Sequence, residues 1–198
     1  MTIDVSRETE ERLDDYAALI RKWNPRINLV APATLPDLRQ RHIDDCLQIA
    51  HHAKPVSGLW ADLGSGGGLP GLVVAIAFQG RAIRFTLVES DQRKAAFLRT
   101  AIRQLDLADT TVLSSRIEAL EPLKADHISA RALAPLPRLM AYLDRHLAID
   151  GRAWLMKGEQ WRSEVAEARK HWNFTADVFP SATKSGAAII NISGVSHV

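Results

Sequence analysis

The sequence predicts an α/β protein built on a mainly parallel, seven-stranded sheet, with helices at the N-terminus and an antiparallel hairpin at the C-terminus. Strand-like apolar runs alternate with helical segments of about 10 to 15 residues, which is typical of a parallel sheet with helices on both faces. Two strand-like runs then follow one another, joined by a polar loop that contains Pro180 and Gly186. This pair predicts a hairpin, and therefore one antiparallel strand in an otherwise parallel sheet.

Length and composition indicate a globular protein. The 198 residues suit one domain with a substantial core, and 46% hydrophobic with 24% charged residues argue against disorder. The charged start, residues 1–8, lacks the apolar centre of a targeting segment, and no apolar run has the length of a membrane span. We therefore expect a cytoplasmic protein that does not bind membranes.

The chain has a single cysteine, Cys46, which excludes an internal disulfide framework and a cysteine-rich metal site. We expect no metal, and we interpret Cys46 as a small semi-buried side chain rather than a reactive thiol. The net charge of +2 permits an anionic partner without requiring one.

Two helices are expected in an N-terminal extension, residues 1–56. The first spans residues 6–24, with early acidic and late basic residues that complement the helix dipole, and Pro25 ends it. The second runs from about residue 36 to residue 53. It carries a dense polar group, which is open to interpretation as a solvated face or as an edge that faces a ligand: Arg39, Arg41, His42, Asp44 and Asp45.

The rest of the chain, residues 57–198, supplies the alternating elements. Strands are expected at residues 59–63, 82–89, 110–113, 127–133, 152–157, 174–179 and 187–193. Helices are expected at residues 72–78, 91–105, 135–147 and 159–172. Asp91 is a candidate cap for the second of these helices, and Asp150 with Gly151 is expected to form a turn before the fifth strand.

The segment Asp62–Gly71 is the most informative part of the sequence. An apolar run reaches Asp62, passes into closely spaced glycines and leaves through Pro70 into a second apolar run. Glycines are needed where the backbone takes a positive φ or where a ligand approaches closely, and proline suits the first turn of a helix. The expected structure is a strand, a tight loop and a helix whose N-terminus faces a nucleotide-like ligand.

The spacing around this loop decides between two ligands. Gly64, Gly66 and Gly68 depart from the spacing of the NAD fingerprint, and a second acid, Glu89, ends the next strand. A carboxylate there can accept hydrogen bonds from both ribose hydroxyls, whereas Asp62 could receive an ammonium group or order the loop. S-adenosylmethionine satisfies these demands better than a dinucleotide. A surface role for Glu89 stays open.

Further candidates follow the other strands, because ligands of such sheets bind beyond the carboxyl ends of the strands. Arg131 ends the fourth strand, although a surface ion pair would also explain it, and Lys157 ends the fifth. Ile117 and Glu118 follow the third strand, where an apolar side chain and a hydrogen-bonding group could flank an adenine.

Five motifs together resemble a known family. They are Trp23–Leu29, Arg41–Asp45, Asp62–Gly71, Ser129–Ala132 and Lys157–Gly158. In this order they are similar to the glucose-inhibited division protein B family, also called RsmG, from about Trp23 to near the end. Members are bacterial methyltransferases that modify N7 of one guanine in the 530 loop of 16S rRNA.

The resemblance implies a Rossmann-like class I methyltransferase fold for residues 57–198 and S-adenosylmethionine as the methyl donor. It assigns cofactor contacts to Gly64, Leu69, Ile117, Glu118 and Arg131. One departure is visible, because Cys46 stands where the family commonly has serine. Both side chains are small, so we expect little change.

The implied reaction needs no general base, because N7 of neutral guanine offers a lone pair and carries no proton. Catalysis then depends mainly on holding the reacting atoms in line. We therefore hypothesise that Arg41, His42 and Lys157 contact RNA phosphate or the O6 edge of guanine rather than transfer protons. Asp45 could orient Arg41 or the base.

The implied partner is 16S rRNA, naked or in a partly assembled small subunit, because the target guanine must be unstacked. Basic residues concentrate in the N-terminal third, which is therefore expected to face RNA; Trp23 fits the core better than a stacked base. A monomer is expected. Three alternatives remain: a methyltransferase for another RNA or a small molecule, a non-catalytic RNA-binding relative, and, least favoured by the glycine spacing, a dehydrogenase.

Overall fold

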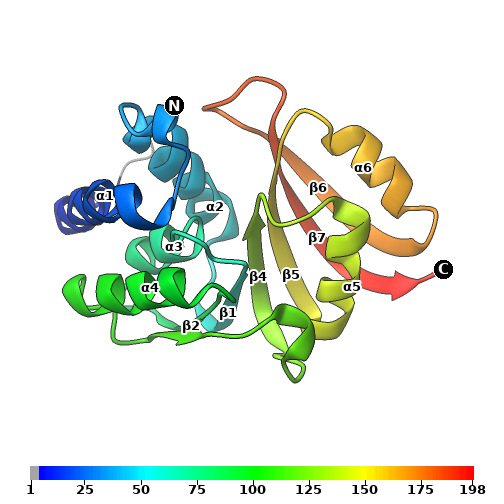
Figure 1. Cartoon of the computed structure of the whole chain (residues 1–198). Coiled ribbons are helices and arrows are strands. Elements are labelled where there is room, and N and C mark those ends of the chain that lie inside the picture. Colours follow the sequence, from blue (N-terminus) through cyan, green and yellow to red (C-terminus); the bar gives the residue numbers. More distant parts are fainter. Residues whose placement is uncertain (1–4) are drawn as a thin grey trace.

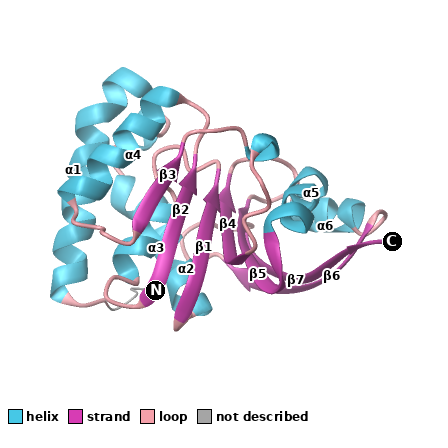
Figure 2. Cartoon of the chain, turned by 90° about the horizontal axis from the view of Figure 1, so that it is seen from below, coloured by secondary structure: helices cyan, strands magenta, loops and turns pink. Residues whose placement is uncertain are grey.

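A seven-stranded sheet crosses the protein in the order β3-β2-β1-β4-β5-β7-β6 (Figure 2). The computed structural model describes residues 5–198. The strands are β1 (Ser57–Leu63), β2 (Ala82–Val88), β3 (Thr110–Leu113), β4 (Ala125–Arg131), β5 (Leu147–Lys157), β6 (Trp172–Pro180) and β7 (Ala188–His197). Only β7 is antiparallel to its neighbours, β5 and β6, so the predicted terminal hairpin and single antiparallel strand are confirmed.

Helices cover both faces of the sheet, as predicted (Figure 1). Those described are α1 (Arg7–Ile27), α2 (Asp45–Ala53), α3 (Gly71–Ala77), α4 (Gln92–Gln104), α5 (Leu136–His146) and α6 (Trp161–Ala168). Successive side chains of β5 point to opposite faces of the sheet and so belong to two separate cores. Trp154 and Met156 pack in the core on the side of α1 to α4, whereas Ala153 and Leu155 pack in the core on the side of α5 and α6. No helix within residues 5–198 is long and apolar enough to cross a membrane.

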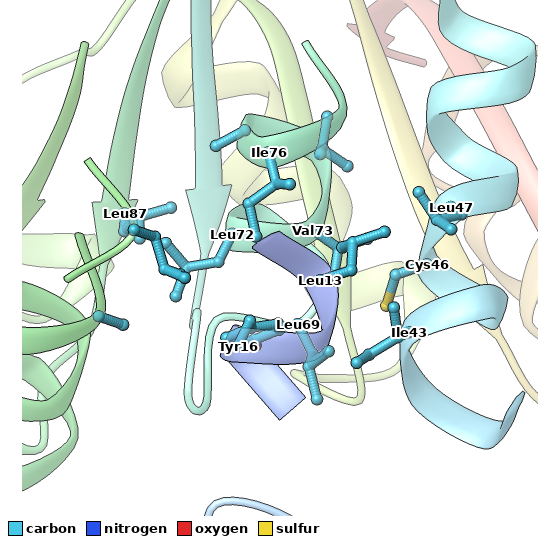
Figure 3. Packing of buried hydrophobic residues seen from close by; sticks show 14 of the residues in the cluster. Leu13, Tyr16, Ile43, Cys46, Leu47, Leu69, Leu72, Val73, Ile76 and Leu87 are labelled. Atoms are coloured by element: carbon cyan, nitrogen blue, oxygen red, sulfur yellow. The ribbon is translucent and has the colours of Figure 1, made fainter. Parts of the chain in front are cut away.

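The N-terminal extension shares a hydrophobic core with the rest of the chain. Leu13 and Tyr16 of α1 and Cys46 of α2 point toward Leu69 and Val73 (Figure 3), and all except Leu69 are almost completely buried. Burying one such aliphatic side chain contributes roughly 1.5 to 3 kcal/mol. Residues 5–56 are therefore tied to the sheet by packing. The first four residues of the predicted extension, and of the charged start, lie outside the described residues.

The two N-terminal helices differ from their predicted forms. Pro25 lies inside α1, which continues to Ile27 and ends where Asn28 takes a left-handed φ of 50°, so the prediction that Pro25 ends the helix is wrong. The helix expected from residue 36 starts instead with π-helical turns over Arg39–Asp44 and becomes α-helical only at α2. Short π-helical segments are frequent at functional sites.

Three further boundaries move. The expected turn at Asp150 and Gly151 lies within the long strand β5, so that prediction is wrong. Helix α6 ends at Ala168 rather than residue 172, because Trp172 already pairs with β7. Strand β4 ends at Arg131 rather than residue 133, because Ala132 takes a φ of 50°, which interrupts an extended strand. The predicted cap of α4 is confirmed: the side chain of Asp91 accepts hydrogen bonds from the first turn.

Candidate functional site

The glycine loop after β1 has the backbone that the sequence predicts. Gly64, Gly66 and Gly68 have φ values of 67°, 56° and 87°, a region that other residues rarely adopt. A Cβ at Gly64 would lie 2.6 Å from the side chain of Leu133, and one at Gly68 would lie 2.5 Å from that of Leu72. These two positions therefore require glycine for conformation and for space.

The N-terminal extension fastens the glycine loop. The hydroxyl of Tyr16, which is completely buried, donates a hydrogen bond of 2.6 Å to the carbonyl oxygen of Gly67. A Cβ at Gly67 would meet Cβ of Leu29 at 3.1 Å, so the extension packs closely on the loop there. No motif in the sequence pointed to this contact; the signal available was a hydroxyl on an apolar helix face, since buried tyrosines usually find a partner.

Asp62 lies beneath the loop and is fully buried. Its Oδ1 accepts a hydrogen bond of 2.6 Å from Ser129, whose Oγ also accepts one of 2.9 Å from the indole of Trp60. Its Oδ2 lies against Gly71 at the start of α3 without a hydrogen-bond partner among residues 5–198. Burial raises the pKa of Asp62 to about 6. Of the two roles expected for Asp62, ordering the loop is the one that these contacts support.

Glu89 follows β2 directly and is 8% exposed. Its two carboxylate oxygens accept hydrogen bonds of 2.7 Å from the backbone amides of Gly66 and Asp91. A carboxylate oxygen has two lone pairs, so each oxygen can accept a further hydrogen bond from a ligand. Glu89 thus joins the glycine loop to the start of α4 rather than standing free on the surface.

A first pocket of about 440 Å³ opens beside the glycine loop at the carboxyl ends of β1, β2 and β4. Seven of the nine predicted cofactor residues line it: Gly64, Gly66, Leu69, Glu89, Ile117, Glu118 and Arg131. Asp62 and Gly68 support the loop without lining the pocket. Three cations at the pocket were missed: Lys94, Arg116 and Arg138.

Side chains of α5 hold the segment after β3 that lines the first pocket. Glu118 accepts hydrogen bonds from the hydroxyl of Tyr142 and, at 3.2 Å, from Arg138. The hydrogen bond from Tyr142 is the main cause that lowers the pKa of Glu118, so the carboxylate is charged. Tyr142 and Arg138 both line the first pocket, and no motif in the sequence pointed to them.

Arg131 is held by the N-terminal extension. One guanidinium nitrogen lies 2.7 Å from Nδ1 of His42 and 3.4 Å from the carbonyl oxygen of Arg41, and the other donates to Sγ of Cys46 at 3.4 Å. Asp45 lies 4.0 Å away and supplies the opposite charge. The surface ion pair considered from the sequence is therefore wrong, because only 20% of the side chain is exposed.

His42 is neutral, and its tautomer follows from its partners. Thr34 donates its hydroxyl hydrogen to the carbonyl of Ala31, so it accepts from Nε2 of His42 at 2.7 Å. Nδ1 then carries no hydrogen and accepts from Arg131. Burial, together with the charge of Arg131, lowers the pKa of His42 to about 4. Both ring nitrogens are engaged within the protein.

A second pocket of about 540 Å³ lies next to the first, and Arg131, Ala132 and Leu133 line both. Lys157 lines the second pocket, where it forms an ion pair with Glu164 and donates to the carbonyl of Ala134 at 3.0 Å. The second pocket therefore contains a lysine whose charge is already balanced.

Asp45 also lines the second pocket, but it does not orient Arg41. It accepts hydrogen bonds from Thr183 and Ser181 of the loop between β6 and β7, and it faces Arg131. The prediction that Asp45 orients Arg41 is wrong for the protein alone, because the side chain of Arg41 is exposed and only its backbone oxygen reaches this cluster.

Three other predictions are decided by packing. Trp23 packs against the core, with its ring 5.8 Å from that of Phe97, as favoured from its spacing. Cys46 is completely buried, and burial raises the pKa of its thiol to about 12, so the structural role is confirmed. Arg39 is held by three acidic residues, Glu10, Asp14 and Asp44, so it is not free for RNA.

The strand order, the glycine loop and the acid after β2 define an S-adenosylmethionine-dependent methyltransferase of Rossmann-like fold. Solved structures share this fold at low identity. A S-adenosylmethionine-dependent methyltransferase from Aquifex aeolicus has a TM-score of 0.60 at 12% identity, with 89% of this chain and 97% of that chain covered. A predicted O-methyltransferase from Agrobacterium tumefaciens has a TM-score of 0.61 at 17% identity, covering 75% and 79%.

Sequence comparison identifies the family within that class. The chain belongs to the GidB family, described as rRNA small subunit methyltransferase G, whose model matches residues 9–189. The ribosomal RNA small subunit methyltransferase G of Paracoccus denitrificans is 55% identical over 195 residues, which are 98% of this chain and 100% of that protein. The protein of the same name from Ruegeria pomeroyi is 50% identical, covering 100% and 97%.

Proposed function

We propose that the protein transfers a methyl group from S-adenosylmethionine to N7 of a guanine in the 530 loop of 16S rRNA. The observation that carries the proposal is the pair of pockets with the common wall Arg131–Leu133. A donor in the first pocket and a base in the second would meet at that wall. The names of the relatives, which act on small-subunit rRNA, support a ribosomal substrate.

The residues of the first pocket fit S-adenosylmethionine. Gly64 presents only backbone to the pocket, and a side chain there would have to displace Leu133. Glu89 has lone pairs left for two ribose hydroxyls, and Ile117 with Glu118 offers an apolar surface and an acceptor for adenine. When bound, S-adenosylmethionine supplies an electrophilic methyl group on a sulfonium.

The side chains around the second pocket bind and orient rather than transfer protons. Guanine N7 has no proton to lose, so a base is not required. Within residues 5–198, His42 uses both ring nitrogens in hydrogen bonds inside the protein, and Lys157 is paired with Glu164. Holding two reactants in line can itself supply about 7 to 11 kcal/mol of rate acceleration. We propose that Arg131 and Lys157 position the base, with Asp45 fixing Arg131.

We propose that the extension, residues 1–56, faces RNA and that residues 57–198 form the methyltransferase core. Exposed cations of the extension without an ion pair among residues 5–198, and so available for phosphate, are Arg21, Lys22, Arg26, Arg41 and Lys54. We further propose that the protein acts as a cytoplasmic monomer on naked or partly assembled small subunits, because unstacking the guanine costs a few kcal/mol in a finished fold.

The test is tritiated methyl transfer into 16S rRNA from cells that lack the endogenous enzyme, with nuclease mapping of the labelled base. We expect one labelled N7-methylguanosine in the 530 loop and a single-turnover rate that is flat between about pH 6.5 and 9. Label at another base, or a steep logarithmic slope in this pH range, would contradict the target or the mechanism without a base. Cofactor binding without incorporation would favour a non-catalytic relative.

A further inference from the structure

The carboxylate of Asp45 is already committed to partners within the protein. Its Oδ1 accepts hydrogen bonds from Thr183 and Ser181, and its Oδ2 faces the guanidinium of Arg131 at 4.0 Å. These contacts hold the loop between β6 and β7 against the π-helical turns. Asp45 therefore shapes the second pocket: its Oδ1 is filled by the loop, and its Oδ2, although no hydrogen bond from residues 5–198 reaches it, faces a guanidinium that competes with any ligand.

Glu164 is the second carboxylate in this pocket, and it is only half committed. Its Oε2 receives the ion pair from Lys157 and a hydrogen bond of 2.7 Å from the backbone amide of Leu136, at the start of α5. No hydrogen bond from residues 5–198 reaches Oε1. Because 21% of the side chain stays exposed, Oε1 is an accessible anionic acceptor on the wall of the second pocket.

The position of Glu164 matches the edge of guanine that lies opposite N7. Arg131–Leu133 line both pockets, whereas Glu164 lines only the second. A guanine that directs N7 to the common wall directs its 2-amino group away from that wall, with N1–H beside it on the same edge. Both are hydrogen-bond donors, and enzymes that unstack a base read this Watson–Crick edge. A carboxylate oxygen is the complementary acceptor.

We propose that Glu164 Oε1 accepts a hydrogen bond from the Watson–Crick edge of the target base and so selects guanine over purines that lack the 2-amino group. This inference rests on the proposed methylation of guanine N7. The same carboxylate neutralises Lys157. The methylated base, which is cationic, therefore does not face an unbalanced charge on Lys157.

Glu164→Gln separates this role from the structural role of Glu164. Lys157 and Leu136 both donate to the position of Oε2, so the amide oxygen of the variant takes that position. The amide NH₂ then replaces Oε1 and turns an acceptor into a donor. The support of α5 is retained, whereas the contact with the N1–H and 2-amino group is lost.

The experiment compares guanosine with inosine, which lacks only the 2-amino group, at the target position of otherwise unmodified 16S rRNA joined from fragments. Single-turnover methylation is measured at saturating S-adenosylmethionine. The wild-type protein should methylate guanosine about ten- to hundredfold faster than inosine, the effect of one hydrogen bond to a charged group. Glu164→Gln should reduce this ratio to about one.

Glu167→Gln is the matched control. Glu167 lies on the same helix, but its carboxylate is 53% exposed and pairs with Lys170, so the guanosine-to-inosine ratio should stay at the wild-type value. Thermal unfolding and S-adenosylmethionine affinity of both variants check that the fold and the first pocket are intact.

Two results would overturn the inference: a wild-type ratio near one, or an unchanged ratio in Glu164→Gln, whether or not its overall rate falls. An equal loss on both substrates is what a purely structural role gives. Failure of the proposed function looks different, because the wild-type protein would then form no N7-methylguanosine on the guanosine substrate.

Discussion

The two pockets are built in different ways. The first is made mainly of backbone and of residues that directly follow strands, with Gly64, Gly66 and Glu89 within one stretch of the chain. The second is made of side chains from distant segments, and most of its charged groups are paired with one another, as in Lys157 with Glu164 and Arg131 with Asp45. In the proposed function, local chain geometry would therefore bind a cofactor common to many proteins, whereas long-range assembly would recognise the particular acceptor.

The largest effect is expected for Gly64→Val, which attacks the first pocket. A positive φ and a Cβ 2.6 Å from Leu133 both oppose the substitution, and the displaced loop should bind S-adenosylmethionine at least about a hundredfold more weakly. Titration calorimetry measures this. Gly80→Ala is the control, since Gly80 has a φ of 82° but nothing within 4 Å. Equal losses in both variants would show that backbone strain alone is responsible.

Glu89→Ala tests the acid of the first pocket. It removes the acceptor for the proposed ribose hydroxyls and for the amides of Gly66 and Asp91, so S-adenosylmethionine affinity should fall by about 1 to 3 kcal/mol, roughly five- to hundredfold. The exposed Glu121→Ala serves as a reference in the same calorimetric measurement. Unchanged affinity would remove Glu89 from the site.

Asp45→Asn tests whether the pockets are separable. The loss of negative charge beside Arg131 also weakens the charge-assisted hydrogen bonds from Thr183 and Ser181, which should loosen the loop that lines only the second pocket. We expect methylation of 16S rRNA to slow about tenfold while S-adenosylmethionine affinity changes by less than about threefold. Parallel losses of rate and cofactor affinity would mean that the common wall couples the two pockets.

His42 predicts a pH dependence of stability. Its folded pKa of about 4 lies below the ordinary value of 6.5. Between these two pH values the unfolded chain binds the proton more readily than the folded chain, so the free energy of unfolding decreases as the pH falls from about 6.5 to about 4. Allowing for solvent at this half-buried ring, we expect a change of about 1 kcal/mol. Asp62, with a raised pKa of about 6, acts in the opposite direction.

His42→Gln isolates that effect, because Asp62 titrates in both proteins. Urea unfolding at about pH 4.5, inside the window between the two pKa values of His42, and at about pH 7, above it, should show a smaller pH dependence for the variant. An identical dependence in both proteins would mean that His42 is not the titrating group.

The smallest effect is expected for Cys46→Ser, which introduces the residue that the family resemblance leads us to expect at this position. Cys46 is buried beside Met156 and accepts from Arg131, and a serine oxygen could accept the same hydrogen bond. S-adenosylmethionine affinity and methylation rate should stay within about twofold of the wild type. A larger gain would show that the sulfur weakens the hold on Arg131.

The sequence by itself determined the parts whose conformation depends on near neighbours. Positive φ values at Gly64, Gly66 and Gly68 follow from residue type, the hairpin follows from two successive strands, and the place of Glu89 follows from the end of β2. Local sterics and strand order suffice for these features. The end of the first helix was wrongly predicted at Pro25, because the packing of α1 extends the helix past a proline that locally disfavours helical structure.

Only the tertiary structure decided how the polar groups are paired. Tyr16 reaches Gly67 across 51 residues of sequence, and Arg131 reaches His42 across 89. No local pattern specifies such contacts, because they depend on how α1, the π-helical turns and β4 pack together. The sequence thus determined which chemical groups stand at the carboxyl ends of the strands, and the packing decided which of them are neutral, which are paired and which remain free for a ligand.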